Sequence, residues 1–225
     1  DKNYYNLLDK KNIKWQAEIA KKYGIYGFCF YHYWFDGHML LEKPIEILLQ
    51  NKDIDINYCI SWANEDWTNA WTNNSNKTLI SQNYGSKKEW IEHFEYFLRF
   101  FKDNRYIRID NKPLLIIYRP ELIGCLNEML DTLKELAIKN GFEGITFAYQ
   151  HFNYGNMKNK DDSRFSYQIE YQPSYSMKES ENNRLLLFMK RIKNKIDVFS
   201  QRIFHKSIPV SELRNNLKKY NYDDL

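Results

Sequence analysis

The chain has 225 residues, an ordinary hydrophobic fraction of 43%, an aromatic fraction of 17% and a formal net charge of +4. Its length fits one large domain or part of one. No stretch reaches the roughly 18 apolar residues of a membrane-spanning helix, which excludes a transmembrane protein of that kind. The excess of rings, 18 Tyr and 6 Trp, favours a sugar or another ligand that stacks on aromatic faces.

The ends and the cysteines indicate where the protein works. Residues 1–5 lack the basic start and apolar core of a signal peptide, and the missing initiator Met suggests that the chain begins inside a longer protein. Cys29, Cys59 and Cys125 are widely spaced in apolar surroundings, so we expect buried thiols and neither a disulfide frame nor a zinc site. These features predict a cytoplasmic protein, and the inner face of the membrane is the alternative location within that compartment.

Helices and strands alternate along the chain. A first helix carries Ile13, Ala17 and Ala20 on one face and stops at Gly24. The pattern then predicts strands over 24–30, 56–60, 113–118, 144–149 and 166–171. It predicts further helices over 44–49 and 121–139, and one that is opened by the capping box Ser86–Glu89. A loop over 35–37 and a turn at 110–112 separate these elements.

This alternation predicts an α/β fold with parallel strands. No G-x-G-x-x-G or P-loop pattern follows a strand, which argues against a nucleotide-binding Rossmann unit. Polar residues after several successive strands suit a (β/α)₈ TIM-type barrel. Because only about five strands can be found, we expect an incomplete barrel, forming a single domain over residues 1–225.

Two aromatic and polar clusters follow predicted strands. The first contains His32, Tyr33 and Trp34, and the second is the run WANEDWTNAW over 62–71. In parallel α/β proteins ligands bind at the carboxyl ends of strands, so we expect both clusters in one site. The candidate sugar-binding residues of the second cluster are Trp62, Asn64, Trp67 and Trp71. A structural alternative stays open, in which Trp62 belongs to the core, Asp66 caps a turn or helix, and His32 is structural.

A basic segment lies over 184–219. It contains ten Lys or Arg and only two acidic residues, Asp197 and Glu212. Its mixture of apolar and cationic residues is compatible with an amphipathic helix on an anionic membrane surface. The alternative, which we prefer, is a solvated helix with Leu187, Ile192 and Val198 turned inward.

Several motifs resemble the WbsX-type glycosyltransferase family. They are YGIYGFCFYHYWF over 23–35, LEKP over 41–44, WANEDW over 62–67, KPLLIIYRP over 112–120 and EYQP over 170–173. The resemblance implies a barrel like that of glycoside hydrolase family 99 and a role in bacterial O-antigen or capsule biosynthesis. Two family segments have no match here: the first strand with its Gly-Phe-Thr-Glu-Trp segment, and the last-strand Asn-Glu-Trp-x-Glu-Gly motif, whose glutamates are catalytic in the related hydrolases.

Glycosyl transfer or hydrolysis usually needs two carboxyl groups, one of them to donate a proton. The catalytic candidates are Glu65, Asp66 and Glu170. Tyr118 follows another strand and joins the substrate-binding candidates, while Arg119 and His32 could hold an anionic group, or Arg119 could form a structural ion pair.

We therefore predict a glycosyltransferase or glycoside hydrolase acting on an oligosaccharide or sugar donor, without metal, cofactor or nucleic acid. The alternatives are a catalytically impaired carbohydrate-binding fragment and a membrane-surface scaffold acting through the basic segment. The oligomeric state cannot be deduced from these patterns.

Overall fold

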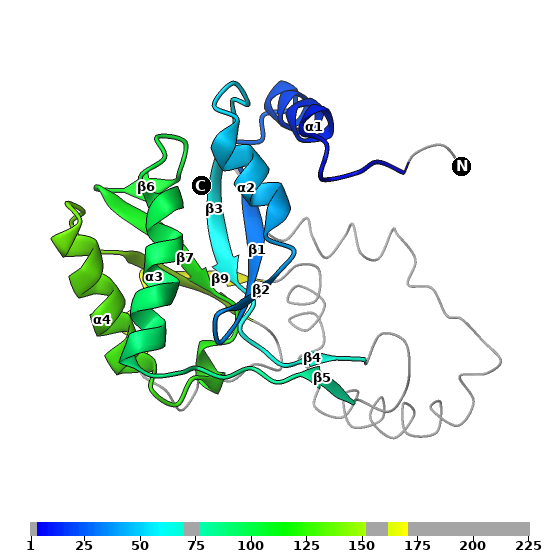
Figure 1. The fold of residues 1–225 in the computed structure, drawn as a ribbon. Helices are drawn as coiled ribbons and strands as arrows, with labels where there is room; N and C mark the ends of the chain where they lie inside the picture. The colour runs from blue at the N-terminus through cyan, green and yellow to red at the C-terminus, as the bar shows by residue number, and fades with distance from the viewer. Residues whose placement is uncertain (1–3, 70–76, 152–161, 171–225) are drawn as a thin grey trace, which may run out of the picture. The chain divides into compact units, whose positions relative to one another are not determined.

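The computed structural model describes residues 4–69, 77–151 and 162–170 (Figure 1). It divides into two compact units. The first comprises residues 1–150 and 157–169, and the second comprises 151–156 and 170–225. Trp71 and the basic segment 184–219 lie outside the described residues.

The first unit is built on a mainly parallel sheet. Strands β1 (Gly27–Phe35), β3 (Asn57–Trp62), β7 (Lys112–Ile117) and β8 (Thr146–His151) follow one another and pair in parallel. The flanking strands are β2 (His38–Leu40) and β6 (Arg108–Ile109), both antiparallel, and β9 (Tyr167–Glu170), which lies next to β8. The predicted mixed α/β fold with parallel strands is confirmed.

The helices connect these strands and cover the sheet (Figure 1). They are α1 (Lys10–Lys22), α2 (Lys43–Gln50), α3 (Lys87–Phe101), the 3₁₀ turn η1 (Pro120–Leu122) and α4 (Leu126–Lys139). The predicted capping box of α3 is present, with Ser86 and Glu89 bonding reciprocally, and its face of Trp90, Phe94, Phe97 and Phe101 is buried. No helix in the described part of the chain is both long and apolar enough to cross a membrane.

Three details of the predicted elements are corrected. The strand predicted over 24–30 continues to Phe35, because Asp36 and Gly37, both with positive φ, form a tight turn into β2. The helix predicted over 121–139 begins only at Leu126, after η1. All three cysteines were expected to be buried thiols, but Cys29 is exposed, Cys125 is partly buried and only Cys59 is buried.

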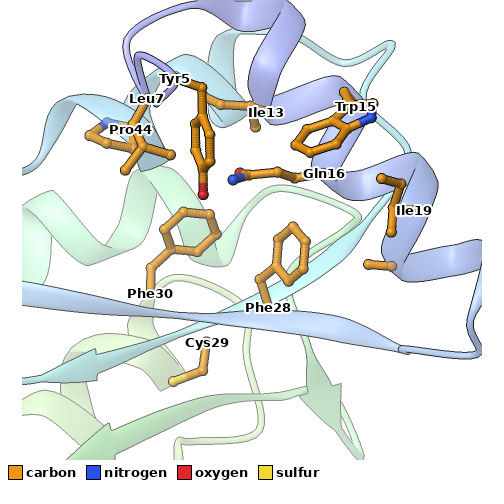
Figure 2. A pocket seen from close by; sticks show the side chains of 11 residues that line it. Tyr5, Leu7, Ile13, Trp15, Gln16, Ile19, Phe28, Cys29, Phe30 and Pro44 are labelled. Atoms are coloured by element: carbon orange, nitrogen blue, oxygen red, sulfur yellow. The ribbon is translucent and has the colours of Figure 1, made fainter. Parts of the chain in front are cut away.

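The alternation of side chains along β1 decides which residues reach the site. Phe28 and Phe30 point toward α1, and Cys29 points to the opposite face (Figure 2). His32 and Trp34 continue this alternation and pack against Tyr96 and His93 of α3. Because neighbouring strands are in register, Tyr58, Ile60 and Trp62 of β3 share the helix-covered face. The opposite face includes Ser61 of β3, Ile116 of β7 and Ala148 of β8, which lie side by side in one row.

A charged network fastens the amino end of the sheet, away from the predicted site. Arg105 donates to the carbonyl oxygens of Leu48, Asn51 and Ile54 and to the carboxylate of Asp103. Burial opposes ionisation of Asp103, but the hydrogen bonds from Arg105 and Lys52 outweigh it and hold the pKa below its usual range. The Arg105 guanidinium thus supplies hydrogen-bond donors for backbone carbonyl groups at and just after the end of α2.

Candidate functional site

A cavity of about 270 Å³ lies where β1, β3 and β7 end. The odd-numbered residues of β1 reach it because they point away from the helices. Ala63, just after β3, leaves room between the larger side chains. Its described lining consists of Tyr31, Tyr33, Phe35, Ala63, Glu65, Asp66, Trp67, Thr68 and Tyr118. The structure thus brings together Tyr33, Glu65, Asp66, Trp67 and Tyr118 of the predicted site.

Three rings form an aromatic platform along one side of the cavity. Trp67 stacks on Tyr33 with ring centroids 5.3 Å apart and on Phe35 at 6.3 Å, with interplanar angles of 14° and 15°. Trp67 belongs to β4 (Trp67–Thr68), which pairs with β5 (Thr78–Ile80) in a two-stranded ribbon that projects from the sheet (Figure 1). Tyr33 and Trp67 are partly exposed, whereas Phe35 is buried. The exposed parts of Tyr33 and Trp67 combine apolar ring faces with a polar O–H or N–H group, which suits amphipathic ligands.

Glu65 is the half-buried carboxylate of the cavity, with 44% of its side chain exposed. Its Oε2 lies 3.4 Å from Nη1 of Arg119, and Arg119 also forms an ion pair through Nε with Glu121. Burial raises the pKa of Glu65, Arg119 opposes that rise, and the negative charges of Glu121 and Asp66 add to it. A carboxyl with a raised pKa beside an apolar platform is suited to donating a proton.

Asp66 lines the cavity and also fixes a loop. Its Oδ1 accepts a hydrogen bond of 2.7 Å from the backbone amide of Gln82, which follows β5. The structural alternative for Asp66 therefore holds in part, because one oxygen bonds a loop amide. The side chain is nevertheless exposed at the cavity.

Asn64 is fully buried and connects the segment that follows β3 to the segment that follows β7. Its Nδ2 donates to the Arg119 carbonyl at 2.7 Å, and its Oδ1 accepts from the Arg119 amide at 2.8 Å. The hydroxyl of Tyr84 donates to the Asn64 carbonyl at 2.9 Å. The predicted sugar-binding amide is thus used internally, where it positions Glu65 and Arg119 after two different strands.

The structure corrects the expectation that His32, Trp34 and Trp62 share the cavity. All three are buried on the helix-covered face, with exposed fractions of 4%, 8% and 3%. Trp34 stacks on His93 of α3 at 4.5 Å, and Trp62 meets the same ring edge-on at 4.9 Å. The structural reading of Trp62 and His32 holds, because alternation along a strand places neighbours on opposite faces.

His32 and His93 form a buried pair, with their Nε2 atoms 2.9 Å apart. Burial lowers the pKa of His32 to about 3 and that of His93 well below its usual value. Both rings are therefore neutral near pH 7, and His32 cannot hold an anionic group. His93 was not singled out from the sequence, although it follows Trp90 by three residues on the apolar face of α3.

Gln150, at the end of β8, is a further polar residue that the sequence reading missed. Its Nε2 lies 3.2 Å from the hydroxyl of Tyr31, and Tyr31 packs edge-on against Tyr118 with centroids 5.9 Å apart. The signal that could have found Gln150 is its place after a predicted parallel strand, the same rule that selected Glu65.

Glu170 is the last described residue of β9 and is exposed. It belongs to the second compact unit, so its catalytic role stays a prediction. The residues that follow it in the motif over 170–173 lie outside the described part.

The protein thus belongs to the α/β class, with a mainly parallel sheet and an acidic cavity lined by aromatic rings at the carboxyl ends of its strands. Comparison with known families is then decisive: the family described as Glycosyltransferase WbsX matches residues 1–225, and the chain belongs to that family. The chain is 30% identical over 185 residues to an uncharacterized protein, WxcX, from two strains of Xanthomonas campestris pv. campestris. That match covers 82% of this chain and 26% of WxcX, so the chain spans about a quarter of its curated relatives.

A solved structure described as a glycoside hydrolase-like protein shares the fold. It matches with a TM-score of 0.50 and 14% identity, and the match covers 82% of this chain and 56% of that one. At this identity the likeness concerns the fold alone.

Proposed function

We propose that this chain is the sugar-binding part of a glycan-processing protein in bacterial surface polysaccharide biosynthesis, such as that of O-antigen or capsule. The observation that carries the proposal is the juxtaposition of the Tyr33, Phe35 and Trp67 rings with the half-buried carboxyl of Glu65. The family assignment and the Xanthomonas relatives support it. We further propose a cytoplasmic location with peripheral contact to the inner face of the membrane.

We also propose a more specific fold for the chain, a TIM-type barrel related to that of glycoside hydrolase family 99. Its parallel strands are neighbours in chain order, as in such a barrel. Tyr31 and Gln150 meet although two strands lie between theirs, a separation of about 14 Å in a flat sheet. Side chains stand roughly perpendicular to a sheet, so this contact requires a concave sheet and supports curvature toward closure.

In the proposed chemistry a glycosyl residue stacks on the platform, and Glu65 protonates the leaving oxygen as the glycosidic C–O bond breaks. A second carboxylate assists the incoming water or acceptor hydroxyl, or attacks the sugar itself, and Asp66 and Glu170 are the candidates. Transfer and hydrolysis share these steps and differ only in the acceptor. Loss of the second carboxylate would leave a protein that binds the glycan without turning it over.

The test is Glu65→Gln in the 225-residue chain. We expect binding of neutral oligosaccharides to weaken at least about tenfold, equivalent to about 1.4 kcal/mol, because the amide keeps the shape and loses the charge. Any glycosidase activity should disappear, and the wild-type rate should fall as the pH rises through the raised pKa of Glu65. Isothermal calorimetry and reducing-end assays provide the measurements.

The matched control is Glu18→Gln on α1, an exposed carboxylate far from the cavity in sequence. The melting temperature of Glu65→Gln should stay close to that of the wild type, because a partly exposed ion pair contributes at most about 1 kcal/mol. A large fall in melting temperature with unchanged saccharide binding would make Glu65 structural and would refute the proposal.

A further inference from the structure

The charge around the cavity separates two classes of sugar donor. The charged side chains among its described lining residues are both carboxylates, Glu65 and Asp66. Glu121 stands behind them, close enough for its charge to act on Glu65. Three carboxyl groups and a single paired arginine, Arg119, therefore gather around the described carboxyl ends of β3 and β7.

Arg119 lies near these carboxylates and is already ion-paired with two of them. Arg119 lies 3.4 Å from Glu65 and forms its closer ion pair with Glu121. The backbone of Arg119 is held by the buried side-chain amide of Asn64, so this backbone cannot shift without breaking two further hydrogen bonds. An incoming anion would have to displace a carboxylate from Arg119 and remain next to it.

We infer that this cavity accepts uncharged glycosyl residues and rejects anionic ligands, so that it does not take a nucleoside diphosphate sugar as donor. The inference rests on the proposed function and narrows it to glycosides with a neutral leaving group. Like charges placed together in a partly desolvated site cost several kcal/mol, because water screens them poorly there. The aromatic platform contributes attraction for the apolar face of a neutral sugar and none for a diphosphate.

The decisive variant is Glu121→Gln, which releases Arg119 from its closer carboxylate. The side chain of Glu121 is 13% exposed, and glutamine can still accept the hydrogen bond from Arg119, so the local structure should be retained. Glu121 is not among the lining residues of the cavity, and binding of neutral saccharides should therefore change less than twofold. Glu65→Gln, which is more exposed, serves as a second variant.

The probes are pyrophosphate, UDP and UDP-glucose, titrated into the wild type, both variants and the Glu18→Gln control. Calorimetry gives affinities, and the indole N–H resonance of Trp67, assigned with Trp67→Phe, reports occupancy of the cavity. We expect no shift of that resonance in the wild type or the control, and at least a tenfold gain in affinity for UDP in Glu121→Gln. The gain should shrink at high salt.

Two outcomes overturn the inference. One is a wild-type cavity that binds UDP or UDP-glucose with a shift of the Trp67 resonance. The other is a Glu121→Gln variant that binds these anions no better than the wild type, since the carboxylates would then not be what excludes them. Failure of the proposed function is a different result, namely a wild-type chain that binds none of a panel of neutral gluco-, galacto- and mannotrioses.

Discussion

Asn64 is the residue on which the site geometry depends most directly. Its side chain makes both a donor and an acceptor contact with the backbone of Arg119, and it is fully buried. These bonds join the segment after β3 to the segment after β7, which lies 55 residues away in the chain. Glu65 and Arg119 are placed side by side by this connection.

Asn64→Ala should lower the free energy of unfolding by about 2–4 kcal/mol, because two buried backbone groups lose their partners. Urea denaturation measures the change. Asn140→Ala is the control, since Asn140 bonds the Leu136 carbonyl at an exposed helix end and should change stability by less than about 0.5 kcal/mol. Equal effects of the two substitutions would show that the Asn64 contacts contribute little.

The buried pair of His32 and His93 makes stability depend on pH. Both pKa values are lowered by burial, so the folded state stays neutral where the unfolded chain, with pKa values near 6.5, takes up protons. Stability contributed by this pair is complete above pH 6.5 and is lost as the pH falls below it. The loss between pH 7.5 and 5.5 is up to about 1.4 kcal/mol for each histidine.

Urea titrations at the two pH values check this, using the double variant His32→Leu/His93→Leu. Replacing both partners removes the titrating groups and should flatten the pH dependence by roughly 1–3 kcal/mol. Asn140→Ala, which removes no titratable group, should leave the slope as it is. A double variant with the wild-type slope would mean that other groups cause the pH dependence.

Among the elements, β1 contributes most to the site. It pairs in parallel with β3 from Gly27 to His32 and then in an antiparallel hairpin with β2 from Tyr33 to Phe35. This extension carries Tyr33 and Phe35 beyond the sheet, where Trp67 can stack on both. Without the Asp36–Gly37 turn the platform would lack two of its three rings.

The close approach of β1 to β3 begins at Gly27. A Cβ there would lie 2.6 Å from the carbonyl oxygen of Asn57, a backbone atom that cannot move independently of β3. Gly27→Ala should therefore destabilise the protein by about 1–3 kcal/mol through overpacking. Thermal unfolding followed by circular dichroism measures the effect.

Gly124→Ala is the matched comparison for this substitution. No heavy atom lies within 4 Å of a Cβ at Gly124, so alanine should be neutral or should stabilise by up to about 1 kcal/mol. The prediction for Gly27 is contradicted if both variants unfold at the same temperature.

At the scale of the whole first unit, the flank formed by α1 and β1 exposes many apolar side chains. A second cavity of about 560 Å³ lies there, lined largely by Tyr5, Trp15, Ile19, Phe28 and Phe30 (Figure 2). Trp15 is 49% exposed and Ile19 39% exposed. Exposed apolar surface next to a sheet edge favours association of chains.

Trp15→Gln/Ile19→Gln should therefore raise the concentration at which the isolated 225-residue chain self-associates, by at least about threefold. Light scattering coupled to size-exclusion chromatography gives this concentration. Ile138→Gln on α4 is the control, because Ile138 is equally exposed at 52% but lies outside this flank. An unchanged association of the double variant, or an equal effect of Ile138→Gln, would contradict the prediction.

Local patterns were sufficient to predict much of this protein. The capping box at Ser86, the apolar faces of α1 and α3 and the alternation of strands with helices depend on neighbours in sequence, so the sequence alone determined them. The motifs around Trp34, Glu65 and Tyr118 were also sufficient for the family, which the comparison confirms.

Only the tertiary structure decided which of these residues share the cavity. The extent of β1 places Tyr33 and His32 on opposite faces, and that extent follows from pairing with β2 and β3. The side-chain amide of Asn64 bonds to the backbone of Arg119, a residue distant in the chain. Burial against His93 keeps the His32 ring neutral. Such contacts form between segments whose spacing in sequence carries no signal, so folding decides them.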